Sequence, residues 1–131
     1  MKNLILLTFI IPVITAFQPA SSFKGTWQFV GDIHRGKREG PPDGYALQKK
    51  YDEKHYAAFV IEKGLRPEKY ETGDYVLKGD TCIDTETFCS QPSKITHIPI
   101  HYLFTIKKDT LTIKGVLPNG TQVEEYWKKV K

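Results

Sequence analysis

The chain has 131 residues, a formal net charge of +4 and hydrophobic residues at 40% of its positions. This length predicts a single domain. The basic residues are scattered apart from the short clusters 34–38 and 128–131, which argues against nucleic-acid binding, because a nucleic-acid interface needs a continuous basic face.

Residues 1–20 have the layout of a secretory signal peptide. Lys2 precedes an uncharged apolar run, and Ala16 and Ala20 are small residues near which cleavage is expected. The run is shorter than the roughly 20 apolar residues of a membrane span, although an uncleaved anchor is the alternative. We therefore expect an exported, periplasmic or extracellular protein with no membrane span in the mature chain, residues 21–131, whose charge falls from +4 to +3 when Lys2 is removed.

Alternation of apolar and polar residues runs through nearly all of the mature chain. The expected strands cover residues 25–30, 45–52, 55–62, 68–79, 81–89, 98–108, 110–116 and 121–130. Turn residues separate them, and Gly73 inside one of them marks a bulge or a close backbone approach. This pattern predicts an all-β fold, an antiparallel sandwich or barrel of about eight strands. Residues 31–44, with four glycines and two prolines, are expected to form a long loop of the kind that is often functional or mobile.

The two cysteines, Cys82 and Cys89, both lie in the exported part. In an oxidising compartment such a pair predicts a disulfide, which would join the two arms of a hairpin if this segment forms one. Two free, buried cysteines are the alternative. Because no Cys-x-x-Cys motif or Cys/His cluster accompanies the pair, we expect no metal site.

The chain also carries the features of a barrel family: Gly25 and Trp27 on the first strand, a long first loop, a run of hairpins, and Lys128 or Lys129 on the last strand. This pattern resembles the lipocalin and calycin barrels, most of all the short lipocalin-like domains of secreted bacterial proteins, over nearly all of the mature chain. The resemblance implies an antiparallel up-and-down barrel in which a basic residue, Lys129, packs over Trp27. The chain departs from the family in its short length and in lacking a clear C-terminal helix. It also has lysine where the family has arginine, and lysine cannot stack as a planar fork.

Independently of the family, a large indole suits the closed end of a barrel, so Trp27 is expected to be structural.

The side chains capable of chemistry form no familiar catalytic motif. His97 and His101 are about 13 Å apart along one strand, too far to share a metal ion. Asp84 and Glu86 have a spacing that a glycosidase pair permits, but two acids on a solvent-facing strand explain it equally well. The sequence contains none of the usual hydrolase, metalloprotease or nucleotide-binding motifs. We therefore expect no enzymatic activity, no catalytic residues and no cofactor.

The function that the pattern favours is the binding of a small, largely apolar ligand inside the barrel. If Lys49 faces the core, its ammonium group must reach solvent or meet an anion. Apolar walls with a few polar groups are typical of small-ligand sites. The candidate ligand-binding residues are Tyr45, Lys49, Tyr51, His55, Phe59, Tyr75, Tyr102 and Phe104. The alternative is a structural or interaction module, a barrel filled by its own side chains that binds a protein or surface partner through residues 31–44.

The sequence leaves two matters open. The oligomeric state is one. The other is the register of the last strand: Glu125 lies inside if Trp127 faces inward, and is solvated if Tyr126 does. An inward Glu125 would be a partner for Lys49 or His55.

Overall fold

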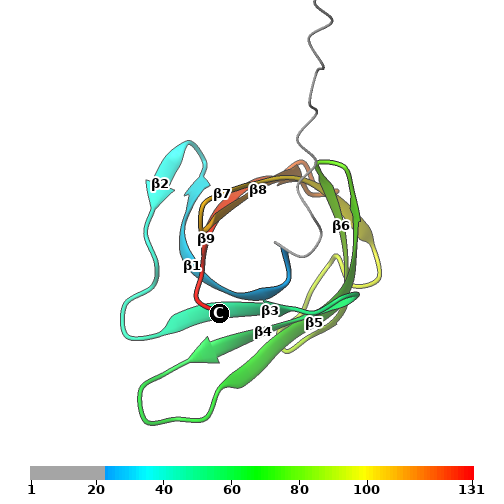
Figure 1. Cartoon of the computed structure of the whole chain (residues 1–131). Helices are drawn as coiled ribbons and strands as arrows, with labels where there is room; N and C mark the ends of the chain where they lie inside the picture. Colours follow the sequence, from blue (N-terminus) through cyan, green and yellow to red (C-terminus); the bar gives the residue numbers. More distant parts are fainter. Residues whose placement is uncertain (1–22) are drawn as a thin grey trace, which may run out of the picture.

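The computed structural model describes residues 23–131, so the predicted signal peptide lies outside the described residues. The described elements are β1 (Gly25–His34), β2 (Lys37–Glu39), β3 (Ala46–Tyr51), β4 (His55–Ile61), β5 (Glu68–Lys78), β6 (Thr81–Cys89), β7 (Pro99–Lys107), β8 (Thr110–Val116) and β9 (Gln122–Lys129). They form one antiparallel sheet in the order β2-β1-β3-β4-β5-β6-β7-β8-β9, and β1 also pairs with β9, which closes the sheet into a barrel (Figure 1). The predicted all-β barrel of eight strands is confirmed, with β2 as a ninth strand outside the closed ring. Within the described residues, no helix has the length and apolar character needed to cross a bilayer.

The bounds of seven predicted strands, from β3 to β9, agree with the structure to within one residue. The prediction of a loop at residues 31–44 was wrong over much of its length, because two strands occupy part of it. β1 continues to His34, the chain reverses at Arg35 and Gly36 with φ values of 51° and 75°, and β2 returns beside β1. Two consecutive residues with positive φ make the tight turn whose twist suits a hairpin. The segment is therefore a β-hairpin followed by a short connection to β3.

One end of the barrel is closed by aromatic rings. Phe23, at the start of the described chain, is fully buried. Its ring lies 4.6 Å from Tyr51, 5.1 Å from Phe104 and 5.4 Å from Tyr75, measured between ring centres. Edge-to-face and offset contacts at these separations stabilise a core beyond the area that they bury.

Trp27 packs into this closed end and is fully buried. Its indole N–H donates a hydrogen bond to the carbonyl of Phe23 at 2.8 Å, and the Lys129 Nζ lies 5.3 Å from the centre of its ring. Gly25 begins β1 with a φ of 127°, and a Cβ there would lie 2.4 Å from the Lys131 carbonyl oxygen. The glycine thus permits the close approach of β1 to the C-terminal residues.

The expected disulfide is absent, because Cys82 and Cys89 are both free. A disulfide would require this segment to form a hairpin, whereas both cysteines lie on the single strand β6, as the strand prediction for residues 81–89 had it. Seven residues of extended chain span about 23 Å, and a disulfide needs Cα atoms within about 7 Å of each other. The strand geometry therefore excludes a bond between these two residues within one chain.

Candidate functional site in the barrel interior

The barrel interior carries an unusual number of polar and ionisable side chains. They come from the inward-facing positions of strands β3 to β7 and of β9, with the aromatic floor below them. The group comprises Lys49, Tyr51, Tyr56, Tyr70, Glu71, Cys82, Asp84, Glu86, Tyr102, Glu125 and Trp127, and electrostatic coupling links Lys49 to most of the others. We call Glu71, Asp84, Glu86 and Glu125 the inner carboxylates.

Lys49 supplies the cation of this cluster. Its ammonium nitrogen lies between two aromatic rings, 5.3 Å from the centre of Tyr56 and 5.1 Å from that of Trp127. Both distances are typical of cation–π contacts. Burial lowers the pKa of Lys49, but the electrostatic influence of Tyr51 and of three inner carboxylates raises it, and the net direction is well above the usual value. Lys49 is therefore a charged group inside the barrel.

The inner carboxylates outnumber the cations around them. Asp84 is 7% exposed and Glu86 is 5% exposed. Their hydrogen-bond donors are neutral: the Cys82 thiol at 3.0 Å from Asp84, and the Thr96 hydroxyl at 2.7 Å from Glu86. Among the described residues, no lysine or arginine forms an ion pair with any inner carboxylate. The alternative in which Asp84 and Glu86 lie on a solvent-facing strand is wrong, because both acids are buried.

Burial shifts the titration of two of these acids. Desolvation raises the pKa of Asp84, and the positive charge of Lys49 opposes that shift. The pKa of Glu71 is raised for the same reason, with Lys49 and a hydrogen bond from Tyr56 acting in the other direction. Both shifts follow from removing a negative charge from water without placing a cation next to it.

Glu125 and Trp127 settle the register of the last strand. Trp127 is 3% exposed, and its indole N–H donates to the Glu125 carboxylate at 2.9 Å. Glu125 therefore faces the interior, on the same face of β9 as Trp127. On the opposite face, Tyr126 lies beneath the guanidinium of Arg38, 5.2 Å from it.

Tyr51 presents a hydroxyl group with no hydrogen-bond partner among the described residues. The residue is 2% exposed, and its hydroxyl has no hydrogen bond within the described part of the chain. Burial raises the pKa of Tyr51 well above its usual value, so the hydroxyl is protonated. A buried hydroxyl without a partner costs about 1–3 kcal/mol, and such groups in native proteins usually contact water or a ligand.

Of the predicted ligand-binding residues, the structure brings five into the interior or its floor. Lys49, Tyr51 and Tyr102 face the polar cluster, and Phe104 and Tyr75 belong to the core. The Tyr75 hydroxyl turns to the barrel end, where it donates to the carbonyl of Asp52.

The other three predicted residues lie elsewhere. Tyr45 is 44% exposed. His55 is exposed, with its Nδ1 2.5 Å from the Asp74 carboxylate. Phe59 lies under Lys69, whose nitrogen is 5.8 Å from the ring centre. Strand β4 turns the alternate residues inward, among them the buried Tyr56, so the predicted alternation was right and the predicted inner face was wrong.

The candidate ligand-binding set also left out interior residues: the three acids Glu71, Asp84 and Glu86, and the uncharged Tyr56, Cys82 and Trp127. The sequence did contain a signal that Asp84 and Glu86 face inward. Cys82, Asp84 and Glu86 alternate along one strand, so a buried Cys82 carries both acids to the same face.

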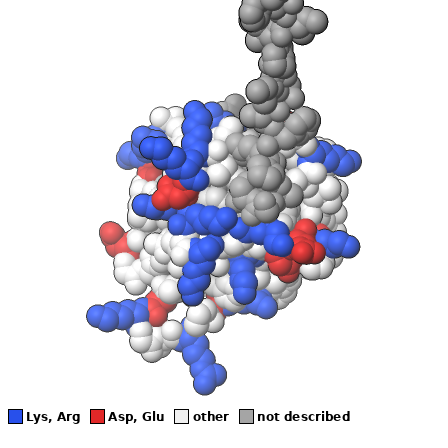
Figure 2. Space-filling model, viewed as in Figure 1, with Lys and Arg blue, Asp and Glu red and all other residues white. Residues whose placement is uncertain are grey.

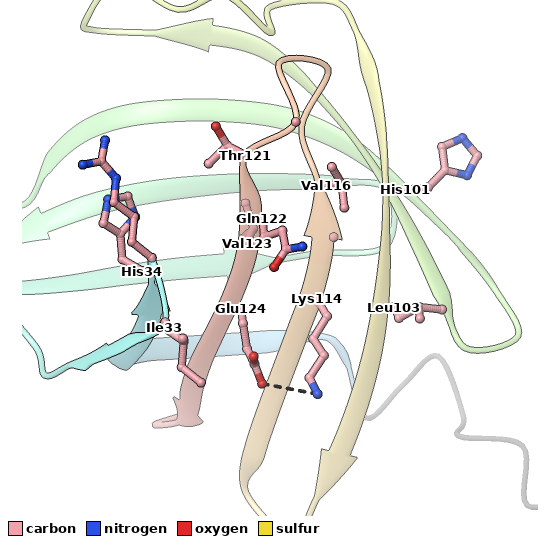
Figure 3. Close-up of a pocket in the computed structure, with 14 residues that line it drawn as sticks. Ile33, His34, His101, Leu103, Lys114, Val116, Thr121, Gln122, Val123 and Glu124 are labelled. Atoms are coloured by element: carbon pink, nitrogen blue, oxygen red, sulfur yellow. Dashed lines mark ion pairs between the residues drawn. The ribbon is translucent and has the colours of Figure 1, made fainter.

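A hollow lies on the outside of the barrel. It has a volume of about 890 Å³ and lies between the tip of the β1–β2 hairpin and the outer face of β7, β8 and β9. Figure 3 shows Ile33 and His34 on one wall, and Glu124 and Lys114 extending toward each other on the other, with the ion pair between them at 3.3 Å.

The inside and the outside of the barrel carry opposite charge. The described residues include 18 Lys and Arg, the 19 of the whole chain less Lys2, and 15 Asp and Glu. One of these cations and four of these acids are inside, which leaves a net charge of −3 inside and +6 outside with all of them ionised. Figure 2 accordingly shows more Lys and Arg than Asp and Glu on the face in view.

No model of a known protein family and no curated protein matches the sequence.

Proposed function

We propose that the protein is an exported, lipocalin-like barrel that binds a small ligand in its interior, and that this ligand joins an apolar body to a positively charged group. The observation that carries the proposal is the polar interior itself: four inner carboxylates, one lysine and an unpartnered tyrosine hydroxyl. A barrel of this size either fills its interior with side chains or holds one small ligand. An interior that served packing alone would be apolar.

The charge balance favours a cationic ligand over an anionic one. Buried carboxylates without a cation are unfavourable, so an amine or another organic cation that approaches Asp84 or Glu125 would offset part of that cost. An anion would add to the repulsion. Tyr56, Tyr102 and Trp127 offer aromatic surface for the apolar part of the ligand, and the Tyr51 hydroxyl offers a hydrogen bond. The sequence alone suggested a largely apolar ligand, and the inner carboxylates refine that expectation.

The first experiment is native mass spectrometry of protein purified without refolding, followed by extraction into organic solvent. A discrete added mass, lost on denaturation and recovered in the extract, would support the proposal and identify the ligand. If only the mass of the ligand-free chain is found, binding is tested with added probes.

The second experiment compares two fluorescent amphiphiles of opposite charge, dansylcadaverine and 1-anilinonaphthalene-8-sulfonate, in buffer with EDTA. We expect the cationic probe to bind at least about tenfold more tightly, a difference of about 1.4 kcal/mol, and to quench tryptophan fluorescence. Glu125→Gln should weaken that binding, while Glu124→Gln, next to it on the outer face, should not. Equal affinity for both probes, or equal effects of both variants, would contradict the proposal.

Partner binding through residues 31–44, the alternative function, stays a prediction. The hollow in Figure 3, one wall of which is the β1–β2 hairpin, lies where such a partner would bind.

A further inference from the structure

We propose that Glu71, Glu86 and Cys89 form a binding site for a divalent metal ion of the zinc type. Each residue offers one ligand atom, and the three atoms all lie within 4.8 Å of one another. The site belongs to strands β5 and β6. Two of its donors, Glu71 and Glu86, are inner carboxylates, so the site draws on the same excess of negative charge as the proposed function, but its donor atoms do not require the small ligand.

The pairing of β5 with β6 explains how the chain brings these groups together. Glu71 lies directly opposite Cys89. Between Thr72 and Gly73 the register shifts, so that Thr72 pairs with Phe88 and Gly73 with Glu86, which leaves one extra residue on β6. In a regular strand, residues 86 and 89 would face opposite sides of the sheet. The bulge changes the alternation and brings both side chains to the same group.

Bulges of this kind often redirect a side chain next to a functional site. This one depends on a glycine: a Cβ on Gly73 would lie 2.5 Å from both the Thr85 carbonyl oxygen and the ring of Tyr56. The sheet thus has a local irregularity at the point where the three donor groups converge.

The donor set itself selects the kind of metal. Zinc binds thiolate sulfur at about 2.3 Å and carboxylate oxygen at about 2.0–2.2 Å, which requires ligand atoms roughly 3.5 Å apart. Small rotations of the side chains, each moving its ligand atom by about 1 Å, would bring the three atoms to that spacing. A thiolate favours zinc over magnesium and calcium, which take oxygen ligands. Three protein ligands would leave one coordination position for water.

A separate observation also points to a cation here. Glu86 is 5% exposed, and its described contact is the Thr96 hydroxyl. No lysine or arginine of the described residues pairs with Glu86 or with Glu71. Lys49 is held between Tyr56 and Trp127 instead. A buried carboxylate normally has a positive partner or a metal ion, and a divalent ion would supply the missing charge. The Thr96 hydroxyl would then orient a ligand, as outer hydrogen bonds do in metal sites.

The test uses the full mature chain stripped of metal with EDTA and returned to chelator-free buffer. Zinc is titrated against a chromophoric chelator, and cobalt(II) is added separately as a spectroscopic probe. We expect one zinc ion per chain, and a near-ultraviolet absorption from thiolate-to-cobalt charge transfer. Cys89→Ser should abolish that absorption and weaken zinc binding by at least about tenfold, and Glu86→Gln should weaken zinc binding by a similar factor. Cys82→Ser is the matched control, and it should retain both signals.

Two further variants keep the proposal falsifiable. His55→Ala removes an exposed histidine next to an acid, a rival site for an adventitious ion, and should leave zinc affinity unchanged. Glu125→Gln should weaken the cationic probe and not zinc, whereas Cys89→Ser should do the reverse, so failure of one proposal is distinguishable from failure of the other. Absence of stoichiometric zinc binding, or a folded Cys89→Ser protein with wild-type zinc affinity, would overturn the metal site.

Discussion

The ammonium group of Lys49 lies 5.1 Å from the centre of the Trp127 ring, and within the described residues it has no carboxylate at ion-pair distance. The lysine is held by aromatic faces and by the longer-range field of the inner carboxylates. This arrangement places a cation in the middle of a barrel without neutralising any single acid. It leaves the interior with an excess of negative charge, on which both proposals depend.

Replacing Lys49 with methionine should destabilise the protein at neutral pH. The substitution keeps a long apolar side chain but leaves the inner carboxylates without their cation. We expect a loss of about 3 kcal/mol in the free energy of unfolding, measured by urea denaturation in EDTA. Lys50→Met is the matched control, because Lys50 is exposed on the other face of β3, and it should change stability by less than about 0.5 kcal/mol. Equal effects of the two variants would show that the charge of Lys49 does not matter.

Stability should depend on pH through Asp84 and Glu71. Their folded pKa values are raised above the ordinary 3.8 and 4.5 by burial, so the folded state holds more protons than the unfolded state above those values. Stability therefore falls as pH rises through the folded pKa values, by up to about 1.4 kcal/mol per pH unit for each group.

An Asp84→Asn/Glu71→Gln variant cannot lose those protons. Relative to the wild type, it should be more stable at about pH 7.5 than at about pH 5. Urea denaturation of both proteins at the two pH values, in EDTA, measures the difference. Comparison with the variant cancels the opposite effect of Asp52, whose pKa is lowered mainly by backbone hydrogen bonds. A difference that does not change with pH would contradict the assignment.

Gly73→Ala should destabilise the sheet at the bulge. The new methyl group would meet the Thr85 carbonyl oxygen and the ring of Tyr56, both at 2.5 Å, and overpacking of this kind costs about 1–3 kcal/mol. Gly40→Ala is the control, since a Cβ there meets nothing within 4 Å. Urea denaturation of the two variants would decide the matter, and a Gly73→Ala protein as stable as the control would show that the bulge relaxes freely.

The strands could be predicted closely because local signals define them. Alternation identifies each strand from β3 to β9, and turn residues such as Asn119-Gly120 end them. The β1–β2 hairpin was missed because its turn, Arg35-Gly36, lacks an asparagine or aspartate before the glycine and its short second strand is entirely polar. The fold class followed from the strands that local sequence does define.

The site was harder to predict because it depends on which face of each strand turns inward. Period-two alternation gives two sets of residues and does not by itself select one. For β4 the wrong set was chosen, which put His55 inside in place of Tyr56. For β6 the sequence left open whether the acids at 84 and 86 face solvent, where acids usually lie, although Cys82 on the same face of the strand favoured burial. The bulge that brings Glu86 and Cys89 together depends on pairing with β5, which no local pattern reveals.

The two thiols should differ in reactivity. Cys82 is 1% exposed, and burial raises the pKa of its thiol, whereas Cys89 is only partly buried. In EDTA, a disulfide reagent should modify one thiol of the native protein and both thiols in urea. Cys89→Ser should remove the native reaction, and Cys82→Ser should not. An intact mass lower by two hydrogens, with no reactive thiol in urea, would instead indicate an intramolecular disulfide.

The buried volume of the Trp27 indole should contribute more to stability than its hydrogen bond to Phe23 or its contact with Lys129. Trp27→Ala removes a fully buried indole and should cost about 3–5 kcal/mol. Trp27→Phe keeps a ring but loses the hydrogen bond to Phe23, and its cost should be smaller. Lys129→Ala removes the cation from the face of Trp27 and should cost about 1 kcal/mol or less. Urea denaturation of the three variants should give this order. If Lys129→Ala were as damaging as Trp27→Ala, the stability of the closed end would come from the cation above the ring rather than from the volume that the indole fills.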